Sequence, residues 1–121
     1  MSEVADSAVR KFQKELNAGT VALVLLSVLH RSKEPLYGYQ IAKRLEETES
    51  SGMAIKQGTL YPVLRSLEAQ GLLSSRVEPS VSGPPRKYYS ITRDGIEVLG
   101  AWTEVWRKTR AFVETTLEGG R

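Results

Sequence analysis

One short segment of the chain, from Gly58 to Arg76, combines polar side chains with a helical spacing of leucines. The spacings of four and three predict a helix with one apolar side, formed by Leu60, Leu64 and Leu67. The polar residues on its other sides and just ahead of it are Lys56, Gln57, Thr59, Tyr61 and Arg65. Hydroxyl, amide and basic groups of this kind bind phosphate oxygens and base edges. The chemistry that this segment favours is therefore binding to duplex DNA.

Two residues of this helix, Arg65 and Pro62, indicate how the helix would be placed against DNA. Arg65 has two interpretations: contact with a DNA phosphate, which we favour, and a surface ion pair with Glu68 one turn further along. Pro62 has no amide hydrogen and fits only near a helix start, so the first turn is expected around Gly58 to Pro62. The free amides and positive dipole of that end would then point toward a DNA groove.

A β-hairpin is predicted directly after this helix. Gly71 can adopt the left-handed conformation that ends a helix, and residues 72–78 can form a strand. Residues 79–85 contain three prolines, a glycine and two serines, which predicts a long turn. Residues 86–92, RKYYSIT, would return as the second strand. A helix followed at once by such a hairpin is typical of a winged helix.

The second strand of this wing carries basic and aromatic residues. Arg86 and Lys87 are expected near the tip, where they would contact the DNA backbone or the minor groove. Tyr89 shares one face with Ile91, while Tyr88 lies on the other. We interpret these tyrosines as packing residues, because base stacking requires unpaired bases.

The net charge of +3 is unevenly distributed. Between Lys56 and Arg93, six basic residues oppose two acidic ones, whereas the rest of the chain has eleven basic and twelve acidic residues. A basic face on a nearly neutral body is typical of a protein that binds a polyanion. On charge alone, a solvated face without a partner is an equal alternative.

Three helices are expected ahead of this segment. The first ends at Asn17-Ala18-Gly19 and has an apolar stripe formed by Ala5, Val9, Phe12 and Leu16. Thr20 can cap the second, whose residues 21–29 are nearly all apolar and therefore belong in the core. The third covers about residues 36–47 and buries Tyr37, Ile41 and Leu45. Tyr39 lies off that stripe, so it either faces DNA or is a plain surface tyrosine.

A last helix, from Arg93 to Leu117, has more apolar surface than a small domain can cover. Thr92 can cap it, and its main seam has coiled-coil spacing: Leu99, Trp102, Trp106, Thr109 and Val113. A second stripe consists of Val98, Val105 and Phe112. The physical solution for such a surface is a second subunit, so we predict a homodimer.

Three motifs in this order resemble one known family. LYGYQIAKRLE at residues 36–46, GTLYPVLRSLEAQGLL at 58–73 and GPPRKYYSITRDG at 83–95 are similar to the PadR family of bacterial transcriptional regulators. The resemblance implies a winged helix-turn-helix dimer, usually a repressor, that binds a palindromic operator and is released by a small molecule. The family commonly has a serine-proline pair where this chain has Lys56-Gln57.

The resemblance also suggests a role for the tryptophans. The short-C-terminal, multidrug-responsive subgroup often places an indole of each subunit at the dimer centre, around a flat ligand, and Trp106 matches that position. The alternative is that both tryptophans are interface anchors. The expected residues of the ligand pocket or dimer interface are Val9, Phe12, Leu99, Trp102, Val105, Trp106 and Val113. The expected DNA-binding residues are Tyr39, Lys56, Gln57, Thr59, Tyr61, Arg65, Arg86 and Lys87.

Other functional classes find little support in the sequence. The chain has no cysteine and a single histidine, His30, and shows no nucleophile–base pair or phosphate-binding glycine loop, so we expect neither an enzyme nor a cofactor or metal site. Without a signal peptide or a long apolar run, the expected location is the cytoplasm, away from membranes. A winged-helix protein-interaction module without DNA or ligand binding is the alternative function.

The expected fold is mainly α with a small β-wing. We divide it into an N-terminal helix for dimer packing (residues 1–19), a winged helix-turn-helix domain (20–92) and a C-terminal dimerisation helix (93–121).

Overall fold

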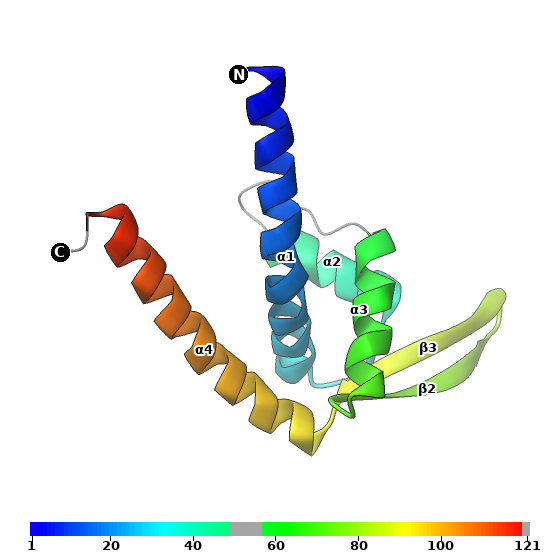
Figure 1. The fold of residues 1–121 in the computed structure, drawn as a ribbon. Coiled ribbons are helices and arrows are strands. Elements are labelled where there is room, and N and C mark those ends of the chain that lie inside the picture. Colours follow the sequence, from blue (N-terminus) through cyan, green and yellow to red (C-terminus); the bar gives the residue numbers. More distant parts are fainter. Residues whose placement is uncertain (49–56, 120–121) are drawn as a thin grey trace.

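Four helices and a three-stranded antiparallel sheet make up the fold (Figure 1). The computed structural model describes residues 1–48 and 57–119. In chain order the elements are α1 (Glu3–Arg31), β1 (Leu36–Tyr37), α2 (Gly38–Thr48), α3 (Gln57–Ala69), β2 (Leu73–Ser80), β3 (Gly83–Ile91) and α4 (Arg93–Leu117). The sheet order is β1-β3-β2. This is the winged helix-turn-helix that the sequence predicts.

The core lies where the second half of α1 meets α2, α3 and the base of the wing. Its largest fully buried side chains are Leu25, Leu26, Ile41, Leu60, Leu64 and Leu67. The predicted leucine stripe of α3 is therefore confirmed, and so is the central place of residues 21–29. By length and composition α1 could cross a membrane, but its most apolar stretch supplies Val21, Leu25 and Leu26 to this core.

The predicted helix break at residues 17–19 is wrong, because α1 runs without interruption from Glu3 to Arg31. The Thr20 hydroxyl donates to the Leu16 carbonyl (3.0 Å) instead of capping a new helix. The Gln13 amide donates to the Asn17 side chain (2.7 Å) across the expected stop. A glycine inside a helix costs only about 1 kcal/mol relative to alanine, so Gly19 does not end a helix that is long on both sides. Residues 1–48 and 57–119 therefore contain four helices, where the sequence predicted five.

The third predicted helix begins two residues later than expected. Leu36 and Tyr37 form β1, paired with Tyr89 and Tyr88 of β3. The backbone N–H of Tyr37 donates to the side-chain carbonyl of Gln40 (3.1 Å), which prepares the start of α2 at Gly38. Only the sheet, formed with residues more than 50 positions away, reveals that these two residues are extended.

The wing differs from the prediction in the length of its turn. The strands extend to Ser80 and resume at Gly83, so only Val81 and Ser82 lie between them. Its prolines flank this short turn, in strands whose outer parts are exposed. The pairing sets Lys87 opposite Val77 and Arg86 opposite Glu78. Arg86 and Lys87 therefore lie in the middle of the hairpin and not near its tip, which corrects their expected position.

Helix α4 begins and ends as predicted and leaves the body on the side away from the wing (Figure 1). The Thr92 hydroxyl caps it by accepting from the Gly95 amide (3.0 Å). Its first turns pack on the core through Val98, Leu99 and Trp102. Beyond Thr103 every described residue of α4 is exposed.

Candidate nucleic-acid interface and an adjoining groove

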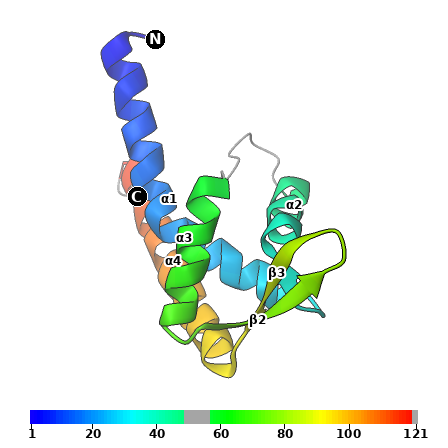
Figure 2. The same cartoon turned by 90° about the vertical axis from the view of Figure 1, so that its right-hand side faces the viewer.

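Helix α3 stands between the wing on one side and the α1–α4 pair on the other (Figures 1 and 2). The side chains of Tyr61 and Arg65 face the wing across a cleft of about 350 Å³. Its lining residues are Tyr37, Gly38, Tyr61, Arg65, Pro85, Arg86, Lys87 and Tyr89. The structure thus brings together residues of α3 and the wing that the sequence assigned separately to DNA binding.

A close contact between α2 and α3 positions Tyr61. A methyl group at Gly38 would overlap the Tyr61 ring, whose Cε1 atom would lie only 2.6 Å away. Gly38 therefore leaves the space that the ring fills at the first turn of α2. Tyr61 remains 40% exposed, so it is anchored on one side and open on the other.

An aromatic cluster holds Arg86 on the outer side of the sheet. The guanidinium carbon of Arg86 lies 4.5 Å above the ring centre of Tyr37, a cation–π contact. Tyr37 also packs edge-on against Tyr88, at 5.3 Å between ring centres, and stacks with Tyr39 at 6.3 Å. Tyr39 is exposed, as predicted for a residue off the apolar stripe of α2. These contacts restrict Arg86 while leaving it charged and exposed.

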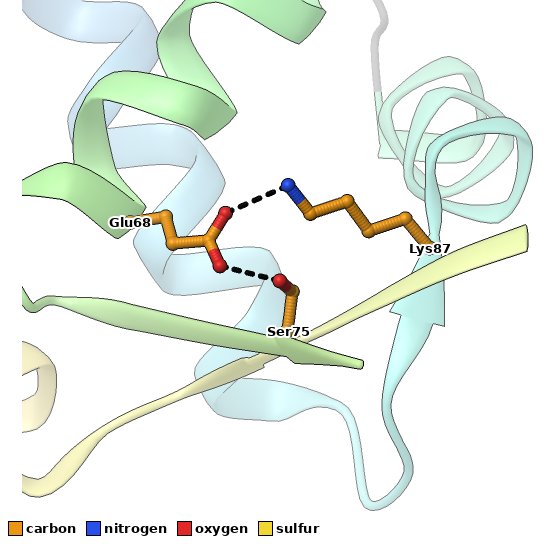
Figure 3. Close-up of polar contacts among 3 residues, drawn as sticks. All are labelled: Glu68, Ser75 and Lys87. Atoms are coloured by element: carbon orange, nitrogen blue, oxygen red, sulfur yellow. Dashed lines mark hydrogen bonds and ion pairs between the residues drawn. The ribbon is translucent and has the colours of Figure 1, made fainter. Parts of the chain in front are cut away.

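Lys87 points the other way and is paired with α3 (Figure 3). Its ammonium nitrogen lies 2.9 Å from Oε1 of Glu68, whose other oxygen accepts a hydrogen bond from the Ser75 hydroxyl. The Ser75 hydroxyl and Lys87 hold the pKa of the Glu68 carboxyl below its usual value, and Glu68 raises the pKa of Lys87. Glu68 thus pairs with Lys87, and not with Arg65 as the alternative interpretation of Arg65 required.

The two acidic residues of the basic segment are both neutralised locally. Glu68 pairs with Lys87, and Glu78 pairs with Arg76 at 2.9 Å within β2. Among the residues that the structure describes, Arg65 and Arg86 form no ion pair. These two cations are therefore the ones available to a polyanion at the cleft.

The remaining predicted contacts lie around the start of α3. Thr59 is exposed, but it precedes Tyr61 by two positions and so projects from the opposite side of the helix. Pro62 lies in the second helical turn, because α3 already begins at Gln57. Lys56 and the Gln57 side chain lie outside the described residues.

On its other side α3 borders a groove of about 730 Å³. Helix α1 contributes residues between Glu15 and Leu23, and α3 contributes Pro62, Val63, Ser66, Leu67 and Gln70. Helix α4 contributes Trp102, Val105, Trp106 and Thr109. Trp106 is 39% exposed, whereas Trp102 also packs on the core. A molecule in this groove would touch both the tryptophans and the helix that carries Arg65.

The sequence profile of the PadR-like family of transcriptional regulators matches residues 25–101, more than half of the chain. The chain belongs to the PadR-like family. A PadR family transcriptional regulator from Eggerthella lenta has a TM-score of 0.81 and 37% identity, covering 98% of this chain and 99% of that one. A transcriptional regulator of Mycobacterium tuberculosis is 34% identical over 91 residues, which cover 74% of this chain and 75% of the relative.

The transcriptional regulator YqjI of Escherichia coli is 26% identical over 106 residues, which cover 88% of this chain and 46% of that protein. The PadR-like chain therefore spans about half the length of this relative. The family consists of transcriptional regulators that bind DNA and not of enzymes. Within residues 1–48 and 57–119 no three His, Asp or Glu side chains gather as metal ligands.

The PadR-like chain exposes apolar residues on both of its long helices. On the N-terminal half of α1 these include Val9 and Phe12, and on α4 they include Val105, Phe112 and Val113. Phe112 is 73% exposed, which is unusual for a phenylalanine in a folded domain. Leu99 and Trp102 differ from the other predicted interface residues, since both pack on the hydrophobic core of the chain.

Sequence reasoning missed three residues that shape the interface. Glu68 appeared only as a possible partner of Arg65, and Ser75 had no assigned role. The alternation of β3 contained the missing signal: Lys87 is two residues before Tyr89, so both side chains face α3. Gly38 was also missed, since only the fold shows that the Tyr61 ring lies against it.

Proposed function

We propose that this PadR-like regulator is a homodimeric repressor that leaves its operator when a small aromatic or hydrophobic ligand binds beside Trp106. The observation that carries the proposal is the groove of about 730 Å³, which has tryptophans of α4 on one wall and α3 on another. Its volume is in the range of small-molecule sites. The same helix therefore borders both the DNA cleft and the proposed ligand site.

The exposed apolar residues of α1 and α4 support the homodimer. A large apolar surface on a small domain marks an interaction site, and the same surface on a second copy is its simplest partner. Val9, Phe12 and Val113 would lie in this interface, with Val105 and Trp106 at its border with the groove. The interface and the ligand site would then be continuous.

On the DNA side, α3 would enter the major groove and the wing would contact the backbone. Tyr61 and Arg65 would be the contacts from the side of α3 that faces the wing. Thr59, Gln57 and Lys56 would contact DNA only from the start of the helix. Arg86 would bind a backbone phosphate, and Tyr39 would contribute from α2. Two copies would occupy successive major grooves of a palindromic operator, about 34 Å apart.

Release by a ligand requires differential binding. A ligand shifts an equilibrium only if it binds one arrangement more tightly than the other. In this protein a flat molecule between α3 and α4 would favour a spacing of the two α3 helices that does not match the operator. The functional division would be residues 1–19 and 93–121 for dimer packing and residues 20–92 for DNA, in a protein of the cytoplasm.

The test uses genomic fragments that the protein selects, with flavone as a planar probe. Flavone should release the wild-type protein from such a fragment, as measured by fluorescence anisotropy of labelled DNA. Trp106→Ala should bind the fragment and resist release. Release of Trp106→Ala at the wild-type flavone concentration would exclude Trp106 from the site. Sedimentation velocity should show a dimer, and Phe112→Glu should shift it toward the monomer.

The family assignment favours this function over a protein-interaction module without DNA binding. The two differ in an easily measured property. A DNA-binding protein loses duplex affinity steeply as salt rises, whereas an interaction module has no duplex binding to lose.

A further inference from the structure

A single carboxylate connects α3 to both strands of the wing (Figure 3). Glu68 Oε1 lies 2.9 Å from the ammonium nitrogen of Lys87 on β3. Glu68 Oε2 accepts a hydrogen bond from the hydroxyl of Ser75 on β2. Because the two partners belong to different strands, this contact restricts the hairpin as a unit and not one strand alone.

The strand register explains why both partners reach the same carboxylate. Ser75 is paired with Tyr89 and Val77 with Lys87, so these four side chains lie on one face of the hairpin. That face is turned toward α3. The Lys87 ammonium group lies 5.4 Å from the ring centre of Tyr89, which is buried. Lys87 therefore extends back along the wing toward α3 and away from the tip.

Glu68 shares a side of α3 with the residues proposed to contact DNA. It follows Arg65 by three positions and Tyr61 by seven, which places all three side chains along the edge that faces the wing. An acidic group at this edge repels phosphates, and its ion pair neutralises one cation of the wing. Glu68 therefore weakens the attraction of this face to any duplex. At the same time its contacts with Lys87 and Ser75 fix the wing relative to α3.

We infer that Glu68 is a positioning residue for the wing, and that its ion pair withholds Lys87 from DNA phosphates in the operator complex. The inference rests on the proposed DNA binding and revises one part of it, since Lys87 was expected to contact DNA. Glu68 then has two effects. It sets the wing at the angle that an operator requires, and it lowers the affinity for unrelated duplexes.

The positioning effect is tested without DNA, by hydrogen exchange of the wing amides between residues 77 and 87. Breaking a partly exposed ion pair should speed their exchange about threefold in Glu68→Gln, and Ser75→Ala should act in the same direction. Glu78→Gln is the matched control, because it breaks another 2.9 Å ion pair of the wing without touching α3. It should leave the exchange unchanged. Wild-type exchange in both Glu68→Gln and Ser75→Ala would overturn the positioning role.

The withholding effect is tested by the salt dependence of binding to operator and to an unrelated duplex. Each phosphate contact contributes about 0.9 to the slope of log affinity against log salt. Glu68→Gln should free Lys87, steepen the slope by about 0.9 and raise affinity for the unrelated duplex. The double variant Glu68→Gln with Lys87→Met should return to the wild-type slope.

The double variant separates the two possibilities for Lys87. If Lys87 already contacts a phosphate in the wild-type complex, the slope of the double variant falls below the wild-type slope by about 0.9, which overturns the withholding role. If the wild-type protein binds no duplex at any salt, the proposed function and the withholding role both fail. Hydrogen exchange then still decides whether Glu68 positions the wing.

Discussion

The hydroxyl of Thr92 donates a hydrogen bond to the carbonyl oxygen of Gly71 (2.7 Å), which ties the start of α4 to the end of α3. The Thr92 amide also donates to the Leu72 carbonyl (3.1 Å). Gly71 adopts a left-handed conformation (φ 81°), as its position after α3 predicted. Helix α4, proposed to form the dimer, is thus hydrogen-bonded directly to the residues that follow α3, the helix proposed to enter the major groove. A displacement of α4 would be transmitted to α3 through this joint.

Gly95→Ala should disturb the hydrogen-bonded contact between the start of α4 and the residues that follow α3. A methyl group at Gly95 would collide with the carbonyl oxygen of Leu72 and with the Ile91 side chain. We expect a loss of about 1–3 kcal/mol in the free energy of unfolding, as for overpacked sites in general. Thermal and urea unfolding followed by circular dichroism will measure it.

Gly100→Ala is the matched control in the same helix, since a methyl group there meets nothing within 4 Å. It should stabilise the protein by about 0.5–1 kcal/mol. Equal effects of the two substitutions would show that the contact at Gly95 has no energetic weight.

Gly38→Ala should displace the Tyr61 ring from the first turn of α2. Because the colliding atoms are the outer end of a 40% exposed side chain, the expected cost is that of an unfavourable rotamer, about 0.5–1.5 kcal/mol. Because the clash is with the ring, Gly38→Ala should carry no such cost in a Tyr61→Ala background, so the two substitutions should not be additive. A double-mutant cycle measured by urea unfolding checks this coupling. The same cost in both backgrounds would mean that Gly38 is required for a reason other than Tyr61.

The ion pair of Glu68 predicts a pH dependence. The pKa of Glu68 is lowered in the folded protein, so its contribution to stability is present above the pKa of an unfolded glutamate, about 4.3, and is lost as the pH falls further. At pH 7 the free energy of unfolding of the wild type should exceed that of Glu68→Gln by about 0.2–1 kcal/mol, the range for exposed ion pairs. The difference should shrink at pH 3.5 in urea unfolding. If the difference in stability between wild type and Glu68→Gln were the same at both pH values, Glu68 would not be stabilising the fold as a charged carboxylate.

The two tryptophans should respond differently to a planar ligand. In Trp102→Phe the one remaining tryptophan is Trp106, and in Trp106→Phe it is Trp102, so tryptophan-selective excitation reports on one indole at a time. Flavone should quench the first variant more strongly at low concentration, because Trp106 is 39% exposed at the groove and Trp102 is partly covered by the core. Stronger quenching of Trp106→Phe would place the ligand deeper, against Trp102.

Local sequence patterns predicted most of the fold. The bounds of α4 follow from the Thr92 cap and the spacing of its apolar residues, both of which are local. The stop predicted at Gly19 was wrong because a single glycine is a weak helix breaker, whereas the extended form of Leu36 depends on its pairing with β3. In the cleft, Arg65 and Arg86 are predictable as exposed cations, but the pairing of Lys87 with Glu68 requires the position of the wing relative to α3.

If α3 and the wing form a DNA-binding face, duplex affinity should depend on salt and on the charge of Arg65. The affinity for duplex DNA from the upstream region of its own gene is measured by anisotropy over a range of salt for wild type, Arg65→Ala and Arg107→Ala. Arg107 is an exposed arginine of α4 that pairs with Glu104 (3.7 Å), and its replacement removes the same charge as Arg65→Ala. Helix α4 leaves the body on the side away from the wing (Figure 1). The wild-type affinity should fall steeply with salt, and Arg65→Ala should lower both the affinity and the slope, the latter by about 0.9. Arg107→Ala should match wild type. Absence of duplex binding, or equal affinity and slope in Arg65→Ala and wild type, would show that α3 and the wing do not form a DNA-binding face.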